Sequence, residues 1–333
     1  MVIALMAVYL LWGGTYLGNK VALESVPPLM LTASRFVTAG LLILGGAAAL
    51  GRSVWPGIRR VRSAGLVGLF LVGGGSSLLS LGQQHVHSGL TSLLIASMPL
   101  WALVIGLVLG ARPSRMALIG VVAGFVGLVL LVGASAVTAS VTTGVFILLL
   151  STLTWAIGST VAQRVSMPTD ALVSSGWQMM VGGVLAGVVA GVAGEADDLA
   201  IISVTGRSAL AWLALTVFST AIGYSCYAWL LQNTSMRVAT TYAYVNPVVA
   251  VALGALLLGE RLVWIQVPGA LLILAAVALV LAAERGSVGP ADAALPPSLR
   301  ADVNIATPTP DATGVIGIET DGPAHPQCAG RTT

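Results

Sequence analysis

The chain of 333 residues is 57% hydrophobic and only 8% charged, whereas about a quarter of the residues in a typical soluble domain carry a charge. Such a small number of charged groups cannot cover a water-exposed surface. The composition therefore excludes a soluble protein and predicts a polytopic membrane protein. The formal net charge is +3, but the arginines lie in short loops between apolar runs, and no nucleic-acid partner is expected.

Ten apolar stretches are long enough to cross a bilayer, because a span needs about 20 mostly apolar residues. We therefore expect an all-α fold of ten transmembrane helices. A single helix over 116–163 would measure roughly 72 Å against a hydrocarbon core of about 30 Å, so the chain must turn at "ASAVTASVTT". The expected spans are 2–19, 29–50, 64–82, 89–110, 116–135, 143–162, 171–193, 210–231, 239–259 and 263–283.

The loops between these spans set the orientation through the positive-inside rule. With the N-terminus inside, nine arginines fall on the cytoplasmic side, while the opposite side holds three basic residues and the acidic run "GEADD". Both termini are therefore expected in the cytoplasm, and the proline-rich residues 286–333 are expected to form a disordered cytoplasmic tail. The nine are Arg52, Arg59, Arg60, Arg62, Arg112, Arg115, Arg164, Arg237 and Arg285; the three are Lys20, Arg207 and Arg261.

The two halves of the chain resemble each other. Each half, 1–135 and 143–283, holds five of the expected spans, and an odd number turns the second copy upside down. An inverted repeat with matched helix breakers is typical of secondary transporters, whose site lies near the midplane between the repeats. The matched pairs are Trp12 with Trp155 and Arg35 with Gln178, each 143 residues apart, and Pro99 with Pro247, 148 apart.

Three motifs resemble those of a known family. They are the W-G-x-T-Y of the first span, the P-P-L-M before Arg35, and the Y-A-Y-V-N-P of the ninth span with its following G-E. Together they resemble the drug/metabolite transporter (DMT) superfamily, most closely its EamA-domain family and the YedA-type inner-membrane exporters, over residues 1 to about 285. The resemblance implies ten helices in two inverted five-helix repeats and export of small metabolites or xenobiotics across the bacterial inner membrane. One position departs from the family pattern. The first repeat of family members often ends in Gly-Glu, but here Ala111 follows Gly110, so only the second repeat keeps the acid, as Glu260.

The ninth span gathers most of the candidate pathway residues. Pro247 removes a backbone N–H and leaves carbonyls unpaired near residue 243, and Pro99 repeats this break at the matched position of the fourth span. Tyr242 and Asn246 are four residues apart and share one helix face. These groups either face a water-filled cavity and contact substrate, or form a kink whose polar groups are satisfied by neighbouring helices.

Arg35 is a second candidate, because a charge at this depth costs roughly 2.5–3.5 kcal/mol. It either faces a cavity, where it would suit a carboxylate or phosphate, or snorkels to the outer interface. Further candidates line the pathway or simply pack: Gln178, Trp12, Tyr16, Trp155 and Trp101. His85 and Glu260 are candidates for coupling or gating.

We expect a secondary transporter that works by alternating access, with a passive channel or a membrane sensor as the alternatives. No P-loop, nucleophile–base pair or H-E-x-x-H motif is present, so neither ATP use nor enzyme activity is expected. Two cysteines give no metal spacing, and no cofactor or metal is expected. The expected partners are a small-molecule substrate and the lipid bilayer. The glycines Gly183, Gly187 and Gly191 would fit either a sliding face between repeats or a homodimer contact.

Overall fold

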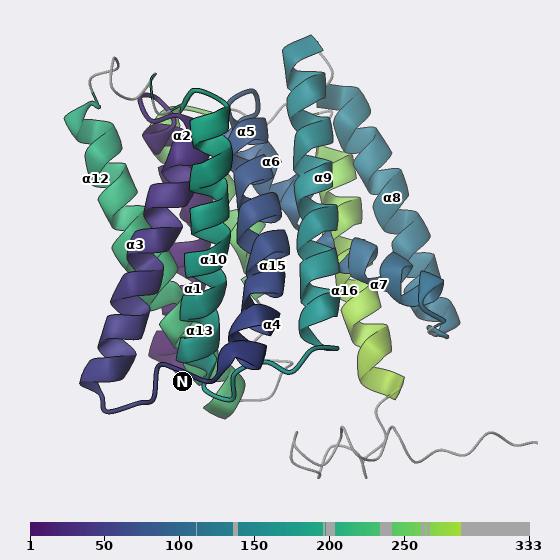
Figure 1. Cartoon of the computed structure of the whole chain (residues 1–333). Coiled ribbons are helices and arrows are strands. Elements are labelled where there is room, and N and C mark those ends of the chain that lie inside the picture. The colour runs from purple at the N-terminus through teal and green to yellow at the C-terminus, as the bar shows by residue number, and fades with distance from the viewer. Residues whose placement is uncertain are drawn as a thin grey trace, which may run out of the picture. The chain divides into compact units, whose positions relative to one another are not determined.

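The computed structural model describes residues 1–110, 112–135, 139–195, 197, 204–233, 242–260, 264 and 267–287. In these ranges every regular element is a helix (Figure 1). The chain divides into a compact unit, Met1–Ser287, and a second unit, Val288–Thr333. The predicted tail, residues 286–333, therefore falls outside the described residues except for its first two.

The described helices follow the expected spans. Seven helical stretches are long and apolar enough to cross a membrane, and three further apolar helices are shorter; each overlaps one of the ten expected spans. The polytopic helical class is thus confirmed. The elements are α1 (Val2–Gly13), α2 (Thr15–Ala22), α3 (Pro28–Ala49), α4 (Ile58–Gly68), η1 (Leu69–Ser76), α5 (Ser77–Gln83), α6 (Ser88–Ile95), α7 (Met98–Val108), α8 (Arg115–Ser135), α9 (Ala139–Ala162), α10 (Ala171–Val192), α12 (Gly206–Ala214), η2 (Leu215–Ile222), α13 (Gly223–Asn233), α15 (Tyr242–Leu258) and α16 (Val267–Ser287).

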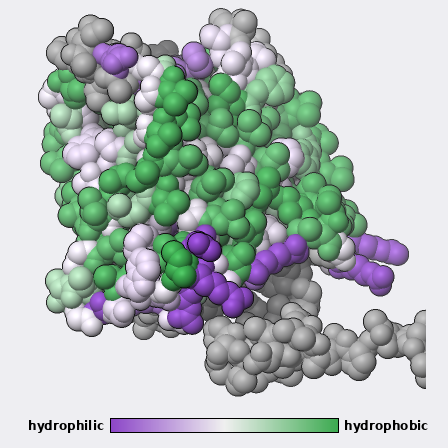
Figure 2. All heavy atoms as spheres, in the orientation of Figure 1, coloured by the Kyte–Doolittle hydropathy of each residue, from purple (hydrophilic) through white to green (hydrophobic). Residues whose placement is uncertain are grey.

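The surface of the helices suits lipid. Large apolar side chains such as Val129, Leu256 and Leu271 are more than half exposed, which would be unfavourable in water. Apolar residues cover the sides of the helices in Figure 2, and hydrophilic residues gather towards one end. The bilayer therefore replaces water around most of this unit.

The first span is longer than expected, because the charge at its end is satisfied. We expected it to stop at residue 19, before Lys20, but α2 continues to Ala22. The Lys20 ammonium donates to the backbone carbonyls of Gln83 (2.9 Å), Gln84 (3.2 Å) and Val86 (3.3 Å). These carbonyls follow or end α5 and have no partner within that helix, so the cation caps it.

The two prolines behave differently. The fourth span is interrupted between α6 and α7, and Pro99 is the second residue of α7, where a missing N–H costs little. Pro247 instead lies inside α15, which is helical on both sides of it. The matched break expected in the ninth span is therefore absent from the described residues, since a membrane helix tolerates an internal proline when neighbouring groups satisfy the freed carbonyl. Residues 239–241 of that expected span lie outside the described ranges.

Two π-helical segments, η1 and η2, were not expected from the sequence. They lie in the third and eighth spans, and both have eight residues. π-Helical turns are rare, and they often occur at functional sites. In η1 a side-chain hydrogen bond spans the same five residues as the π-helical turn. Ser76 Oγ donates to the carbonyl of Leu71 at 3.3 Å.

The packing joins helices far apart in sequence. α3 lies along α10, and α8 lies along α16. The first span contacts the eighth and ninth through α13 and α15, while the sixth, α9, contacts the third and fourth through η1, α5, α6 and α7. The largest buried apolar cluster includes Leu94, Leu100, Leu148 and Ile273, from α6, α7, α9 and α16.

A carboxylate fixes the start of α10. Asp170 accepts hydrogen bonds from the backbone N–H groups of Leu172 (2.9 Å) and Val173 (3.2 Å), and Arg52 lies 2.8 Å from its other oxygen. Burial raises the pKa of Asp170, but the hydrogen bond from Arg52 and those from the two amides outweigh it and hold the pKa below its ordinary value. The carboxylate is thus an N-cap that also carries an ion pair.

We predict that Asp170→Ala lowers stability by about 0.5–2 kcal/mol at neutral pH, the usual loss for an N-cap. Because the folded pKa is depressed, this stabilisation is present above the ordinary carboxyl pKa and is lost as pH falls through the lower folded value. Thermal unfolding of the purified protein across acidic pH measures it. The difference between wild type and Asp170→Ala should shrink with falling pH, whereas Asp170→Asn should keep most of the cap. A difference that stays constant with pH would contradict this assignment.

Candidate functional site

Four aromatic side chains from three spans form one cluster, which we call the aromatic cluster. Trp12 of α1 lies at its centre, with ring centroids 5.2 Å from Tyr224, 5.0 Å from Tyr227 and 4.9 Å from Tyr242. Tyr227 and Tyr242 also meet edge to face at 5.5 Å. Edge-to-face pairs are favourable beyond their buried area. The first, eighth and ninth spans are thus joined by aromatic contacts.

Polar contacts tie the aromatic cluster to η2. Trp12 Nε1 donates to the Ser219 carbonyl at 3.1 Å, and the hydroxyl groups of Thr15 and Ser219 are hydrogen-bonded. Gly223, which follows η2, has no side chain, and a Cβ there would lie 2.6 Å from Trp12 Nε1. The close approach of α1 to this π-helical segment therefore depends on a glycine.

Arg35 of α3 contacts the same segment, η2. It is 6% exposed, and its Nε donates to Thr220 Oγ1 at 2.7 Å. Its guanidinium carbon lies 5.0 Å from the Phe36 ring centroid. Of the two alternatives for Arg35, snorkelling to the interface is therefore wrong, because the side chain is buried against η2. Arg35, Thr220, Ser219 and the aromatic cluster together form what we call the η2 site.

A second polar network lies between α2, α3 and α5. Asn19 Nδ2 donates to Gln83 Oε1 at 2.9 Å, and Gln83 Nε2 donates to the Tyr16 carbonyl at 2.6 Å. Thr32 and Ser80 share a hydrogen bond of 3.1 Å. Among the predicted site residues, Tyr16 thus takes part in this network through its backbone. The buried amides satisfy each other, as polar groups in lipid must.

Asn246 has a buried acceptor without a donor. The residue is 7% exposed, and within the described ranges its Oδ1 has no hydrogen-bond partner. Its backbone carbonyl faces α1, since a Cβ on Gly13 would lie 3.4 Å from it. A buried acceptor left unpaired costs roughly 1–3 kcal/mol, so this oxygen is suited to bind a water molecule or a ligand. Tyr242, one turn earlier, belongs to the aromatic cluster, and the role of both residues in a substrate pathway stays a prediction.

Four predicted residues lie elsewhere. Gln178 donates to Ser174 of its own helix at 3.1 Å, and Trp155 packs against Gly75 of η1. Trp101 meets Phe125 edge to face at 5.1 Å, and its buried indole N–H has no partner in the described part of the chain. Pro99 begins α7. None of these contacts joins the aromatic cluster, and the place of the four residues in a pathway stays a prediction.

The two candidates for coupling lie at the helix ends. His85 is exposed after α5. Glu260 accepts hydrogen bonds from the backbone N–H groups of Ser88 (3.0 Å) and Gly89 (3.2 Å) and from the Ser88 hydroxyl (2.6 Å). It therefore caps the start of α6, and any role in coupling stays a prediction.

Four residues of the η2 site were missed by sequence reasoning. They share a simple signal, because hydroxyl-bearing side chains recur through the eighth span in "FSTAIGYSCY" although it is otherwise apolar. Such a pattern indicates a span that meets polar groups inside the protein. The four are Ser219, Thr220, Tyr224 and Tyr227.

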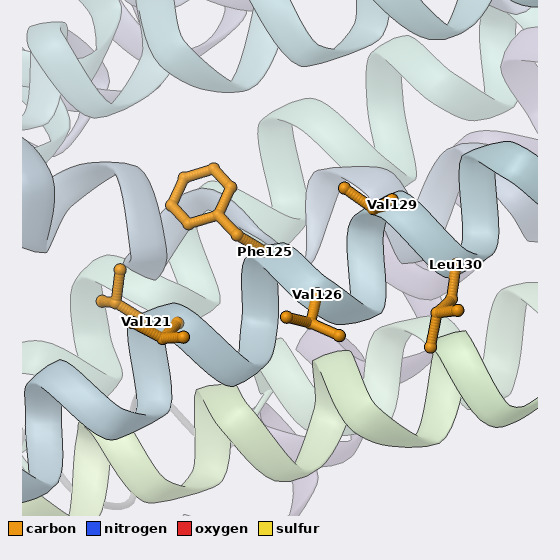
Figure 3. A pocket seen from close by; sticks show the side chains of 6 residues that line it. Val121, Phe125, Val126, Val129 and Leu130 are labelled. Atoms are coloured by element: carbon orange, nitrogen blue, oxygen red, sulfur yellow. The ribbon is translucent and has the colours of Figure 1, made fainter.

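A hollow of about 390 Å³ lies outside this site, along α8. Its lining in Figure 3 is wholly aliphatic or aromatic: Val121, Val122, Phe125, Val126, Val129 and Leu130. An all-apolar groove among exposed side chains fits lipid tails better than a polar solute.

Among the described residues no group of three or more His, Cys, Asp or Glu could hold a metal ion.

A polytopic helical fold with a polar and aromatic site buried between its spans is typical of membrane transporters as a class. The EamA-like transporter family matches this chain twice, over residues 1–133 and 142–282, so the chain belongs to that family. It is 34% identical over 260 residues to the inner membrane transporter YedA of Escherichia coli K12, a match that covers 78% of this chain and 83% of YedA.

Other proteins are similar at lower identity. A WAT1-related chloroplastic protein of Arabidopsis thaliana is 27% identical over 83% of this chain and 68% of its own length. Protein PagO of Salmonella typhimurium is 28% identical over 75% and 83%. A solved crystal structure aligns with a TM-score of 0.56 at 20% identity over 85% of this chain and 98% of its own. At that identity the likeness concerns the fold alone.

Proposed function

We propose that this protein is a secondary transporter that exports small metabolites or xenobiotics across the bacterial inner membrane by alternating access, with both termini in the cytoplasm. The moving parts are two inverted five-helix repeats, 1–135 and 143–283. The match to an inner membrane transporter supports the location. The arginine-rich loops support the orientation.

Matched packing of the two halves is the observation that carries this proposal. η1 and η2 begin at Leu69 and Leu215, 146 residues apart. Trp12 packs against η2 and Gly223, and Trp155, its counterpart, packs against Gly75 of η1. The contacts of the first span with the eighth and ninth mirror those of the sixth with the third and fourth. Such exchange of partners is expected for an inverted repeat, and rocking of one repeat against the other alternates access.

The η2 site supports a substrate path at this symmetric junction. It offers a cation, the aliphatic hydroxyl groups of Ser219 and Thr220, and the rings of one tryptophan and three tyrosines between helices whose outer sides face lipid. Polar groups within a membrane are costly and mark substrate pathways. A passive channel would need a continuous polar lining, whereas these groups gather in one cluster between the first, second, eighth and ninth spans.

Transport by purified protein in proteoliposomes tests the proposal. We expect saturable flux for at least one of a panel of labelled amino acids, purines, organic acids and cationic dyes, measured with and without a pH gradient. Trp12→Phe should reduce that flux on the order of fivefold, because it removes a hydrogen bond of about 1 kcal/mol to Ser219. Trp101→Phe is the matched control, since it removes an indole N–H that has no partner among the described residues.

Each other outcome has a clear meaning. Flux that rises linearly with substrate concentration would favour a passive channel. Flux equal to that of empty liposomes for the whole panel would contradict transport and favour a sensor. Equal loss in Trp12→Phe and Trp101→Phe would contradict a special role of the hydrogen bond between Trp12 and Ser219 in transport.

A further inference from the structure

Arg35 is a buried cation that the described structure leaves without an anion. It is 6% exposed, and its Nε donates to Thr220. A guanidinium has five N–H donors, and no ion pair among the described residues includes Arg35. A buried cation in a membrane is costly and pairs with an opposite charge or with backbone carbonyls, and within the described residues the contacts of Arg35 are the Thr220 hydroxyl and the Phe36 ring. The position therefore calls for a negative charge.

Within the described ranges the chain does not supply that charge. None of the ten expected spans contains an aspartate or glutamate in its interior. Within the described ranges, the carboxylates that have partners are engaged at helix ends. These are Asp170 with Arg52, Glu24 with Arg207, Glu195 with the amides of Leu29 and Met30, and Glu260 with those of Ser88 and Gly89. Among the described residues nothing else faces Arg35 with a negative charge, which leaves a bound ligand as the source of its counter-charge.

The groups around Arg35 indicate what the rest of that ligand is like. Phe36 lies under the guanidinium, and Tyr224 packs against the buried cluster that contains Phe36. Tyr224 also meets Trp12 edge to face. A ligand whose negative group is held by Arg35 therefore has aromatic rings and a phenol beside it. Such surroundings favour an apolar or aromatic body.

We infer that Arg35 binds the carboxylate of an organic monoanion with an apolar body, and that this monoanion is the substrate class of the proposed transporter. The planar fork of a guanidinium matches a carboxylate with two parallel hydrogen bonds. One cation neutralises one negative charge, so a dianion would leave a net charge in a medium of low dielectric constant. The ammonium of a zwitterion would likewise find no carboxylate in the spans. The inference rests on the proposed function for its biological meaning, but the binding itself can be tested separately.

Four ligands that share a phenyl ring and carry different charged groups provide the test. Phenylacetate is a monoanion, phenyl phosphate a dianion at pH 8, phenylalanine a zwitterion and phenethylamine a cation. Each is titrated onto the full-length protein in lipid nanodiscs by calorimetry, and each is measured by its thermal shift, because a ligand of the folded state stabilises it. We expect phenylacetate to bind most tightly and phenethylamine least.

Variants locate the site. Arg35→Gln should weaken phenylacetate binding by at least about tenfold, which corresponds to about 1.4 kcal/mol. Arg35→Lys keeps the positive charge but lacks the planar guanidinium. Its affinity for phenylacetate should therefore lie between those of wild type and Arg35→Gln. Arg52→Gln is the matched control, because it removes an arginine that is 43% exposed at a helix end, and it should bind phenylacetate as wild type does. The ligand series on wild type needs no variant and decides the matter even where Arg35→Gln does not fold.

Contrary results separate the two proposals. Absence of phenylacetate binding to wild type at millimolar concentration, or equal affinity in Arg35→Gln, would overturn the assignment of Arg35. Phenethylamine binding as tightly as phenylacetate would do the same. Saturable transport of a neutral or cationic solute that is unchanged in Arg35→Gln would overturn this inference and leave the transporter standing. Phenylacetate binding that depends on Arg35, without transport of any solute, would support the subsite and contradict the proposed function.

Discussion

Gly68→Ala is expected to be among the most damaging single-atom additions in this chain. Gly68 ends α4 where the third span crosses α10, and a Cβ there would lie 2.8 Å from both the Cα and the carbonyl carbon of Gln178. Gly182 lies one turn further along α10 than Gln178. A Cβ at Gly182 would lie 2.6 Å from the Cβ of Val72. These neighbours are backbone atoms or a stiff β-branched side chain, so no flexible group can move aside. Whole helices must separate.

The expected loss is at the upper end of overpacking, about 3 kcal/mol or more. It is measured as the apparent unfolding temperature and the monodisperse fraction of purified protein in detergent. Gly45→Ala and Gly46→Ala are matched controls in α3, because both glycines are exposed and a Cβ on either meets nothing within 4 Å. They should be neutral or stabilising by up to about 1 kcal/mol, since alanine is the better helix former. Equal behaviour of all three variants would contradict the close crossing of the third span and α10.

The positions of the helices could be predicted, because lipid imposes a length and a composition on every span. The crossing at Gly68 could not, although "GLVGLFLVGGGSS" is rich in small residues, since such a run does not say which helix approaches it. The same holds for the π-helical segments. Nothing in "LTVFSTAI" distinguishes a π turn from an α turn before its neighbours are known.

The candidate site was predicted in part for a similar reason. Trp12 and Tyr242 were singled out from separate spans, and the structure brings them together. Arg35 was singled out by its charge alone, whereas its contact with Thr220 joins residues 185 positions apart. Such pairing follows from tertiary packing, which a single sequence does not specify. The partners in the eighth span were overlooked because serine, threonine and tyrosine lower its hydropathy only slightly.

Glycine–glutamate pairs at two helix ends share one geometry. Gly259, with φ +65°, and Gly194, with φ +82°, both end their helices in the left-handed region that favours glycine. The turn lets the next residue cap another helix: Glu260 binds the first amides of α6, and Glu195 accepts from Leu29 N at 2.8 Å and Met30 N at 2.9 Å in α3. A carboxylate is favourable at a helix N-terminus, where amides are unpaired and the dipole is positive.

The second large effect is expected for Glu260→Ala. It would leave the Ser88 and Gly89 amides and the Ser88 hydroxyl without their acceptor, and the Glu260 side chain is only 11% exposed. Loss of a buried charged acceptor costs roughly 1–3 kcal/mol. Glu24→Ala is the matched control, because Glu24 is 45% exposed and its 3.5 Å pair with Arg207 lies at the surface, where such pairs contribute about 0–1 kcal/mol. Thermal unfolding of both variants measures the difference.

Glu260→Gln then separates capping from proton coupling. If Glu260 carries the coupling proton, the glutamine variant should transport without any dependence on the pH gradient, whatever its stability. If Glu260 only caps α6, the variant should lose stability, because its amide accepts at one oxygen where the carboxylate accepts at two. Flux per folded molecule should then keep its response to the gradient. We expect the second result, since both oxygens of the carboxylate are already held by Ser88 and Gly89, and releasing them for a proton would uncap the helix at every cycle.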